Sequence, residues 1–326
     1  MWLIPSTQYP PDVVDDDELI WAISRYAELA KGAYAKDDAS LRERTGLEES
    51  YIYHADFQES NGSFPRPAFF LAVDDHLQAL VLSIRGTKSA LEVQIDAKWN
   101  PIEFPQMPGA FVHEGIYLAA RWFVDSVLGR LTQLSSLFPD YKIRIVGHSL
   151  GAGIAALFSL MIREVLPHSR AVLFAPPACV SAKLVPLCKE CCISFVNQTD
   201  VLPYLTQANL TSFFTRKKIV HWNEELHSRE QPKNEQTSIA INARDEECVP
   251  DNTARLPSAT EGALIQLYPP GEMHHIFQSL GGSYHLRRVP HDFFNNNCRP
   301  SHTMIKHHHL TNYMESFQAM RNFPSN

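Results

Sequence analysis

Residues 147–151 read Gly-His-Ser-Leu-Gly, a G-x-S-x-G pattern in which Ser149 could act as a nucleophile. A serine hydroxyl is a poor nucleophile at neutral pH unless a base removes its proton during attack. The pattern has this meaning where a sharp turn joins a strand to a helix, because the turn lifts the serine above a sheet. G-x-S-x-G also occurs by chance in many chains, so the flanking residues decide between the two interpretations.

The residues on either side of the pattern favour a strand and a helix. Ile143, Ile145 and Val146 are apolar and β-branched, as in a buried strand. Beyond the pattern, apolar residues recur at helical spacing: Leu150, Ala152, Ala155, Ala156, Leu157, Leu160 and Met161. The run 145–162 is nearly long enough to span a membrane, but it contains the serine, a histidine and three glycines. We therefore interpret the segment as a nucleophile elbow, with Ser149 as the nucleophile.

An elbow serine needs an acid and a histidine, which should follow it along the chain in that order. Residues 171–175 and 192–197 read as the next two buried strands. Asp200 stands just past the second of them, where open α/β sheets place their functional residues. The competing interpretation is an aspartate that only stabilises a turn. The chain order favours Asp200 as the acid.

Three adjacent histidines, residues 307–309, precede an apparent amphipathic helix that runs through Phe317. One of them, on a loop before this helix, could serve as the base. A metal-binding tract is an alternative, but consecutive histidines of a regular element cannot all point at one ion. No H-E-x-x-H or paired C-x-x-C pattern accompanies them. The residue types alone leave the choice among the three histidines open.

Four segments of the chain resemble the class 3 (fungal-type) lipases of the α/β-hydrolase fold, and in particular their intracellular diacylglycerol-lipase-like branch. They are residues 80–89, with an Arg-Gly-Thr loop after a strand; 112–116, Val-His-Glu-Gly-Ile; the elbow, followed by Ala-Pro-Pro at 175–177; and the C-terminal stretch 301–317. The resemblance implies an α/β-hydrolase, with a mostly parallel central sheet flanked by helices.

The C-terminal segment resembles the family's D-H-x-x-x-x-Y pattern, in which the catalytic histidine lies five residues before a tyrosine. Counted back from Tyr313, this step selects His308 as the general base. His307 stands where the family often has an acidic residue, which leaves His309 as the alternative. In such a triad Asp200 would hold the imidazole in the required tautomer.

The negative oxygen of a tetrahedral intermediate needs hydrogen-bond donors fixed beforehand. The N–H of Leu150, one residue past the nucleophile, is the first expected donor. The resemblance implies that the backbone N–H and hydroxyl of Thr87 supply the second. It also matches residues 88–110 to a lid, for which a plain connecting helix is the competing interpretation. The lid residues expected to contact substrate are Leu91, Val93 and Trp99. This chemistry requires no metal ion and no organic cofactor.

The composition suits one large globular core. The chain has 326 residues, of which 44% are hydrophobic and 20% charged, so we expect a single domain over residues 1–326. Residues 205–262 are unusually polar, which predicts an insertion. The net charge is −7 and no basic block is present, which argues against nucleic acid as a partner.

Cysteine usage and the first residues predict a cytoplasmic protein. The start of the sequence lacks the basic region and long apolar stretch of a signal peptide. Cys191 and Cys192 are adjacent at the start of an expected strand, which argues against a disulfide framework. The lone C-x-x-C at residues 188–191 is weak evidence for a metal site.

We therefore expect an esterase or lipase that cleaves acyl esters of glycerolipids, with di- or monoacylglycerol as its substrate. Such a substrate implies transient contact with a membrane surface or a lipid droplet. A phospholipase A1 or lysophospholipase with the same triad is the nearest alternative. A lipase-fold binding or signalling protein without turnover is another. The sequence does not indicate acyl-chain preference or oligomeric state.

Overall fold

The computed structural model describes residues 13–14, 16–58, 66–86, 100–205, 265–294 and 303–322. Apart from Ile265, these residues belong to one compact unit made of residues 1–210 and 266–326. Several predicted features lie outside the described residues: Thr87, Leu91, Val93, Trp99 and, beyond Leu205, the insertion 205–262.

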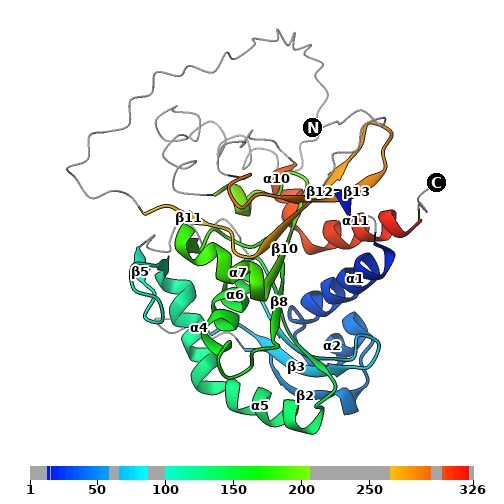
Figure 1. Ribbon diagram of the computed structural model, residues 1–326. Helices are drawn as coiled ribbons and strands as arrows, with labels where there is room; N and C mark the ends of the chain where they lie inside the picture. The colour runs from blue at the N-terminus through cyan, green and yellow to red at the C-terminus, as the bar shows by residue number, and fades with distance from the viewer. Residues whose placement is uncertain are drawn as a thin grey trace, which may run out of the picture. The chain divides into compact units, whose positions relative to one another are not determined.

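Nine strands of the described chain form one sheet (Figure 1). In sheet order they are β1 (Val13–Val14), β13 (Tyr284–Val289), β12 (Glu272–Gln278), β10 (Cys192–Asn197), β8 (Arg170–Phe174), β7 (Lys142–His148), β4 (Ala79–Ile84), β3 (Phe69–Asp74) and β2 (Ile52–Asp56). The central strands β12, β10, β8, β7 and β4 are parallel, and the outer pairs are antiparallel. The prediction of an α/β-hydrolase with a mostly parallel sheet is confirmed.

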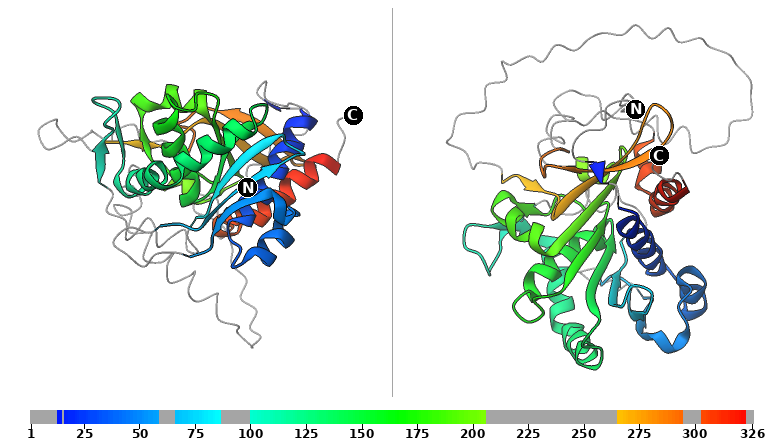
Figure 2. Two further views of the ribbon diagram at one scale, coloured as in Figure 1. Left: turned by 90° about the horizontal axis from the view of Figure 1, so that it is seen from below. Right: turned by 45° about the vertical axis from the view of Figure 1, so that its right-hand side comes forward.

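Helices cover both faces of this sheet (Figure 2). On one face lie α4 (Glu114–Ser126), α5 (Leu128–Leu137), α6 (Leu150–Ile162) and α7 (Val185–Cys191). On the other lie α1 (Asp17–Gly32), α2 (Asp38–Thr45) and α11 (Leu310–Asn322), which follows α10 (Met304–His308). Successive strand residues divide between the two cores: Ile145 of β7 belongs to the α6 face and Val146 to the α1 face.

Helix α1 is positioned by its cap and by one buried ion pair. Asp16 accepts a hydrogen bond from the Leu19 N–H at 2.9 Å, which satisfies one of the free donors at the start of the helix. Farther along, the Arg25 guanidinium lies 2.8 Å from the Asp74 carboxylate at the end of β3. This ion pair holds α1 against the sheet. Tyr34, two residues past the end of the helix, therefore lies near the elbow.

A small antiparallel sheet lies beside the α6 core. It contains β5 (Pro101–Glu103), β6 (Phe111–His113), β9 (Val180–Ser181) and β11 (Leu267–Tyr268). Residues 100–110, the described part of the proposed lid, form β5 and a turn that leads to β6. Phe104 and Ala110 are buried against the core, so a plain connecting helix is wrong for this part. Residues 101–103 instead pair as a strand with β6.

Helix α6 is buried on nearly every side, which explains the membrane-like hydropathy of its sequence. None of the described helices combines the length and the apolar character needed to cross a bilayer. Gly151, in its first turn, lies directly under the end of β4: a Cβ atom there would collide with the Ile84 carbonyl oxygen. The strand and the helix therefore approach more closely than any other residue would allow.

Gly151→Ala should lower the free energy of unfolding by about 1–3 kcal/mol, because the added methyl group has no space beside β4. Gly129→Ala is the matched control, since Gly129 lies in α5 and a Cβ atom added there would have no neighbour within 4 Å. That change should raise stability by about 0.5–1 kcal/mol. Urea denaturation measures both, and equal effects at the two positions would contradict the close approach.

Candidate active site

The predicted elbow is present between β7 and α6. Ser149 connects them with φ 60° and ψ −130°, a backbone conformation that costs a non-glycine residue about 1–3 kcal/mol. A Cβ atom on Gly147 would collide with the Gly151 carbonyl, so both glycines of the motif are required for the turn. The strained turn holds the Ser149 side chain at the carboxyl end of the parallel strands.

The structure brings Ser149, His308 and Asp200 into one hydrogen-bonded chain. His308 Nε2 lies 3.1 Å from Ser149 Oγ, and His308 Nδ1 lies 2.9 Å from Asp200 Oδ1. All three side chains are buried. Asp200 stands three residues past β10, as the order of the strands predicts. The distances suit a base that takes a proton from the serine and an acid that orients the base.

The other two histidines of the tract point elsewhere. His307 Nδ1 lies 2.8 Å from the Thr199 hydroxyl, and His309 is exposed at the C-terminal cap of α10. The expectation of an irregular loop is wrong here, because His307 and His308 form the last turn of α10. Helical geometry rotates neighbouring side chains by about 100°, so only the middle histidine reaches Ser149.

Asp200 is a fully buried carboxylate with several donors. Its Oδ2 accepts a hydrogen bond from the Tyr313 hydroxyl at 2.6 Å, and its Oδ1 also accepts one from the Leu202 N–H at 2.9 Å. Burial by itself raises the pKa of Asp200, but the charge and hydrogen bond of His308, with the bonds from Tyr313 and Leu202, lower it below the usual value. The carboxylate therefore stays ionised beside the imidazole.

A second imidazole, that of His148, packs against the first. Their ring centroids are 4.8 Å apart. His148 Nε2 lies 2.8 Å from the His308 carbonyl oxygen and must donate to it, so Nδ1 accepts from the Tyr34 hydroxyl, also at 2.8 Å. Burial and the nearby His308 lower the pKa of His148 to about 3. His148 is thus a neutral residue that fixes the backbone of the general base.

The sequence pattern did not identify the roles of Tyr34 and His148. His148 occupies a variable position of G-x-S-x-G, and no spacing rule links it to Tyr34, which lies 114 residues earlier in the chain. Tyr313 served only to locate the general base by its spacing, whereas the structure shows its hydroxyl on Asp200. The five-residue spacing between His308 and Tyr313 was the sequence feature that could have predicted the hydrogen bond from Tyr313 to Asp200.

The expected oxyanion donors are partly described. Leu150 is the first residue of α6, so its N–H has no acceptor within the helix. Thr87 lies outside the described residues, but its neighbour Gly86 contacts the elbow: a Cβ there would be 3.0 Å from Ser149 Cβ. The segment 80–86 therefore reaches the nucleophile as the resemblance implies.

Two further histidines, His113 and His275, take structural positions. His113, of the Val-His-Glu-Gly segment, caps α4 by accepting from the Ile116 N–H at 3.4 Å. His275 Nε2 lies 2.8 Å from the Gln198 carbonyl, on the strand next to β10. Within the described part of the chain, no group of three or more His, Cys, Asp or Glu side chains is placed to hold a metal ion.

Fluorophosphonate probes, which react with activated serines, should label the protein at a rate whose logarithm rises with pH by a slope of no more than one. His148 has a pKa of about 3 and is neutral throughout the range of about pH 5–8, so its ionisation contributes nothing to that slope. The second-order rate constant of labelling at graded pH measures the slope. A slope of two would show that His148 also titrates.

Tyr313→Phe should destabilise the protein by about 1.5–3 kcal/mol at neutral pH, because a buried carboxylate loses a donor. Asp200 has a lowered pKa in the folded state, so its ionised form stabilises the fold above the ordinary aspartate pKa of about 4. This stabilisation disappears as pH falls through the lowered pKa. Urea denaturation at graded pH should therefore show the gap between wild type and variant narrowing below about pH 4. A difference in unfolding free energy that does not change with pH would indicate lost packing instead.

Comparison with known proteins agrees with this geometry. Residues 81–210 match the family model of the class 3 lipases. Diacylglycerol lipase-beta of Mus musculus is 33% identical over 178 residues, which cover 53% of this chain and 26% of the relative. Diacylglycerol lipase-alpha of Homo sapiens is 28% identical over 242 residues, covering 64% of this chain and 22% of the relative. The chain thus spans about a quarter of the length of these curated relatives.

Solved structures show the same fold. The triacylglyceride lipase of Rhizomucor miehei superposes with a TM-score of 0.60 at 15% identity, covering 90% of this chain and 94% of that one. The family match contains the elbow and Asp200, and the fold adds His308 from the C-terminal segment. Residues 81–210 are thus similar in sequence to the class 3 lipases, and the chain shares its fold with the Rhizomucor miehei lipase.

Proposed function

We propose that the protein is a serine hydrolase that cleaves acyl esters of glycerolipids, with di- or monoacylglycerol as the substrate. The observation that carries the proposal is the continuous contact from Ser149 Oγ through the His308 ring to Asp200, at 3.1 and 2.9 Å. The similarity to diacylglycerol lipases supports the substrate class. Secreted mono- and diacylglycerol lipase A of Penicillium cyclopium, 29% identical over 143 residues, supports it as well.

The geometry supports an acyl-enzyme mechanism. Ser149 Oγ attacks the ester carbonyl carbon while His308 Nε2 takes the hydroxyl proton, and Asp200 stabilises the imidazolium that forms. The carbonyl oxygen becomes an oxyanion at the N-terminus of α6, where the Leu150 N–H can donate to it. Thr87 is the proposed second donor. As the tetrahedral intermediate collapses, the ester bond breaks and His308 returns the proton to the leaving glycerol oxygen.

Deacylation repeats these steps with water in place of the serine. His308 removes a proton from the water, whose oxygen attacks the acyl carbon and forms a second tetrahedral intermediate. The bond to Ser149 Oγ then breaks, the serine recovers its proton, and a fatty acid is released. The neutral His148 keeps the His308 backbone in place through both half-reactions without competing for the transferred proton.

A phospholipase A1 is the second candidate. The chloroplastic phospholipase A1 PLIP2 of Arabidopsis thaliana is 33% identical over 95 residues, which cover 29% of this chain and 13% of the relative. The same triad would release the acyl group from a phospholipid, so the two candidates differ in the headgroup accepted and not in the chemistry. The binding protein without turnover has no supporting observation, since the three catalytic side chains are in contact.

We also propose a cytoplasmic location with transient association at a membrane surface or lipid droplet. The four described cysteines, at positions 179, 188, 191 and 192, are free thiols, which fits a reducing compartment. A substrate that resides in a lipid phase supports association with that phase.

Ser149→Ala should abolish fluorophosphonate labelling and reduce ester hydrolysis by several orders of magnitude, because only oxyanion and binding effects remain. Ser159→Ala is the control: Ser159 Oγ is buried in α6 and has no hydrogen-bond partner. That variant should label like wild type. Labelling that survives Ser149→Ala would refute the assignment of the nucleophile.

Substrate class is tested with diacylglycerol, monoacylglycerol and phosphatidylcholine of the same acyl chains, presented in identical mixed micelles. We expect a higher kcat/KM for the two neutral glycerides. Faster release of fatty acid from phosphatidylcholine would favour the phospholipase. In both cases Ser149→Ala must remove the activity.

A further inference from the structure

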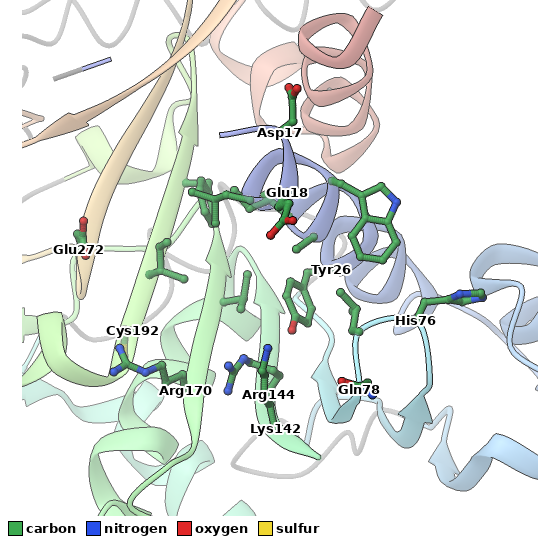
Figure 3. Close-up of a pocket in the computed structure, with 18 of the residues that line it drawn as sticks. Asp17, Glu18, Tyr26, His76, Gln78, Lys142, Arg144, Arg170, Cys192 and Glu272 are labelled. Carbon is green, nitrogen blue, oxygen red and sulfur yellow. The ribbon is translucent and has the colours of Figure 1, made fainter. Parts of the chain in front are cut away.

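A cavity of about 980 Å³ opens at the edge of the sheet opposite the catalytic serine. Ser149 and Asp200 follow the carboxyl ends of β7 and β10, whereas the cavity is lined by the first residues of β7, β8, β10 and β12. The first half of α1 and the turn of residues 75–78 complete its walls (Figure 3). It is therefore separate from the site described above.

Two arginines lie side by side in this cavity. Arg144 of β7 and Arg170 of β8 are register partners, so their side chains leave the same face of the sheet. That face is the one under α1, because Val146 and Val172, two residues farther along each strand, pack in the α1 core. Figure 3 shows both guanidinium groups, with Lys142 beside them, along one side of the cavity.

Among the described residues, the arginine pair lacks a counter-ion. Adjacent like charges on neighbouring strands repel each other. Over the described ranges, neither guanidinium is within ion-pair distance of a carboxylate. Arg144 donates to the Ile143 carbonyl at 2.9 Å and to the Tyr26 hydroxyl, which hold it in place but carry no charge. Two positive charges thus line one recess, and the Arg144 group is held there by its hydrogen bonds.

Two of the four acidic residues that line the cavity have other partners. Glu272 pairs with Arg288 at 2.8 Å, and Asp75 accepts from the Tyr141 hydroxyl at 2.8 Å. Asp17 and Glu18 lie in the first turn of α1, where the helix dipole favours them, on the opposite side from the arginines in Figure 3. Lys142 and Lys189 also line the cavity, and neither forms an ion pair with a described residue.

Arg144, Arg170, Lys142 and Lys189 lie in one cavity of a chain whose net charge is −7. Guanidinium groups donate paired hydrogen bonds to carboxylate and phosphate oxygens, which an amine cannot match in geometry. Apolar side chains of Val172, Ile193 and Trp21 lie beside the charged groups and would accept a short apolar body. We propose that this cavity binds an oxyanion, a phosphate or carboxylate carried on a small amphiphile, between Arg144 and Arg170.

The proposal is tested by calorimetric titration of the full chain with octyl phosphate, octanoate, inorganic phosphate and octanol. Octyl phosphate should bind one to one, and added salt should weaken it. Arg170→Gln should reduce the affinity at least tenfold, since Arg170 is exposed at the first position of β8 and the fold tolerates its loss. Arg121→Gln, which removes an exposed arginine of α4 outside the cavity, should leave affinity unchanged.

The four probes distinguish the sources of the anion. Tighter binding of octyl phosphate identifies a phosphate ester, tighter binding of octanoate a fatty-acid carboxylate, and equal binding of inorganic phosphate a free ion. Equal binding of octanol, no saturable binding, or an equal loss in Arg121→Gln would overturn the proposal. Fluorophosphonate labelling of Arg170→Gln should match wild type, so failure here is separable from failure of the hydrolase assignment.

A second measurement uses stability. Without oxyanions, Arg170→Gln should be at least as stable as wild type, because it relieves repulsion with Arg144. With saturating octyl phosphate, wild type should become the more stable of the two, since a ligand stabilises the state that binds it. Melting temperatures in the two buffers would show this reversal. The same order in both buffers would contradict an anion site.

Discussion

The buried carboxylate of Asp200 is the interaction on which the rest of the site depends. An ionised group with no exposure to water is stable only when nearly every lone pair has a donor. The donors come from three separate parts of the chain: the turn at Leu202, the end of α10 at His308 and the first turn of α11 at Tyr313. Satisfying one charge therefore brings the C-terminal helices to the carboxyl edge of the sheet. His308 reaches Ser149 as a consequence of that packing.

The elbow sets a second constraint, which explains the residues that surround it. Ser149 has a strained backbone, and such strain persists only where neighbouring structure over-determines the turn. Gly151 lets α6 press against β4, and Gly86 lets the chain after β4 pass the elbow at van der Waals distance. His148 and Tyr34 close the remaining side through uncharged hydrogen bonds. Neutrality matters there, because a second cation beside His308 would oppose formation of the imidazolium during attack.

The sequence predicted those features that depend on neighbouring residues or on a fixed step. The strand, elbow and helix are local, Asp200 follows from strand order, and His308 follows from its distance to Tyr313. Contacts between distant residues were not predictable in this way. Tyr34 and His148 are 114 positions apart, and their hydrogen bond depends on how α1 crosses the sheet. The helical turn at α10 was missed because its five residues are too few to show a periodic pattern.

Parallel topology accounts for both the proposed catalytic site and the arginine pair in the cavity at the opposite edge. Parallel strands all start at one edge of a sheet and end at the other. Residues at the starts of the strands therefore lie close together at one edge, and residues at their ends lie close together at the other. At the carboxyl edge this gathers Ser149, Asp200 and His308. At the amino edge it places Arg144 next to Arg170. In the sequence of either strand alone, each arginine is only a polar position, so the pair could not be predicted. Neither guanidinium has an ion-pair partner among the described residues. A ligand charge is the simplest physical reason for such a pair to stand in a recess.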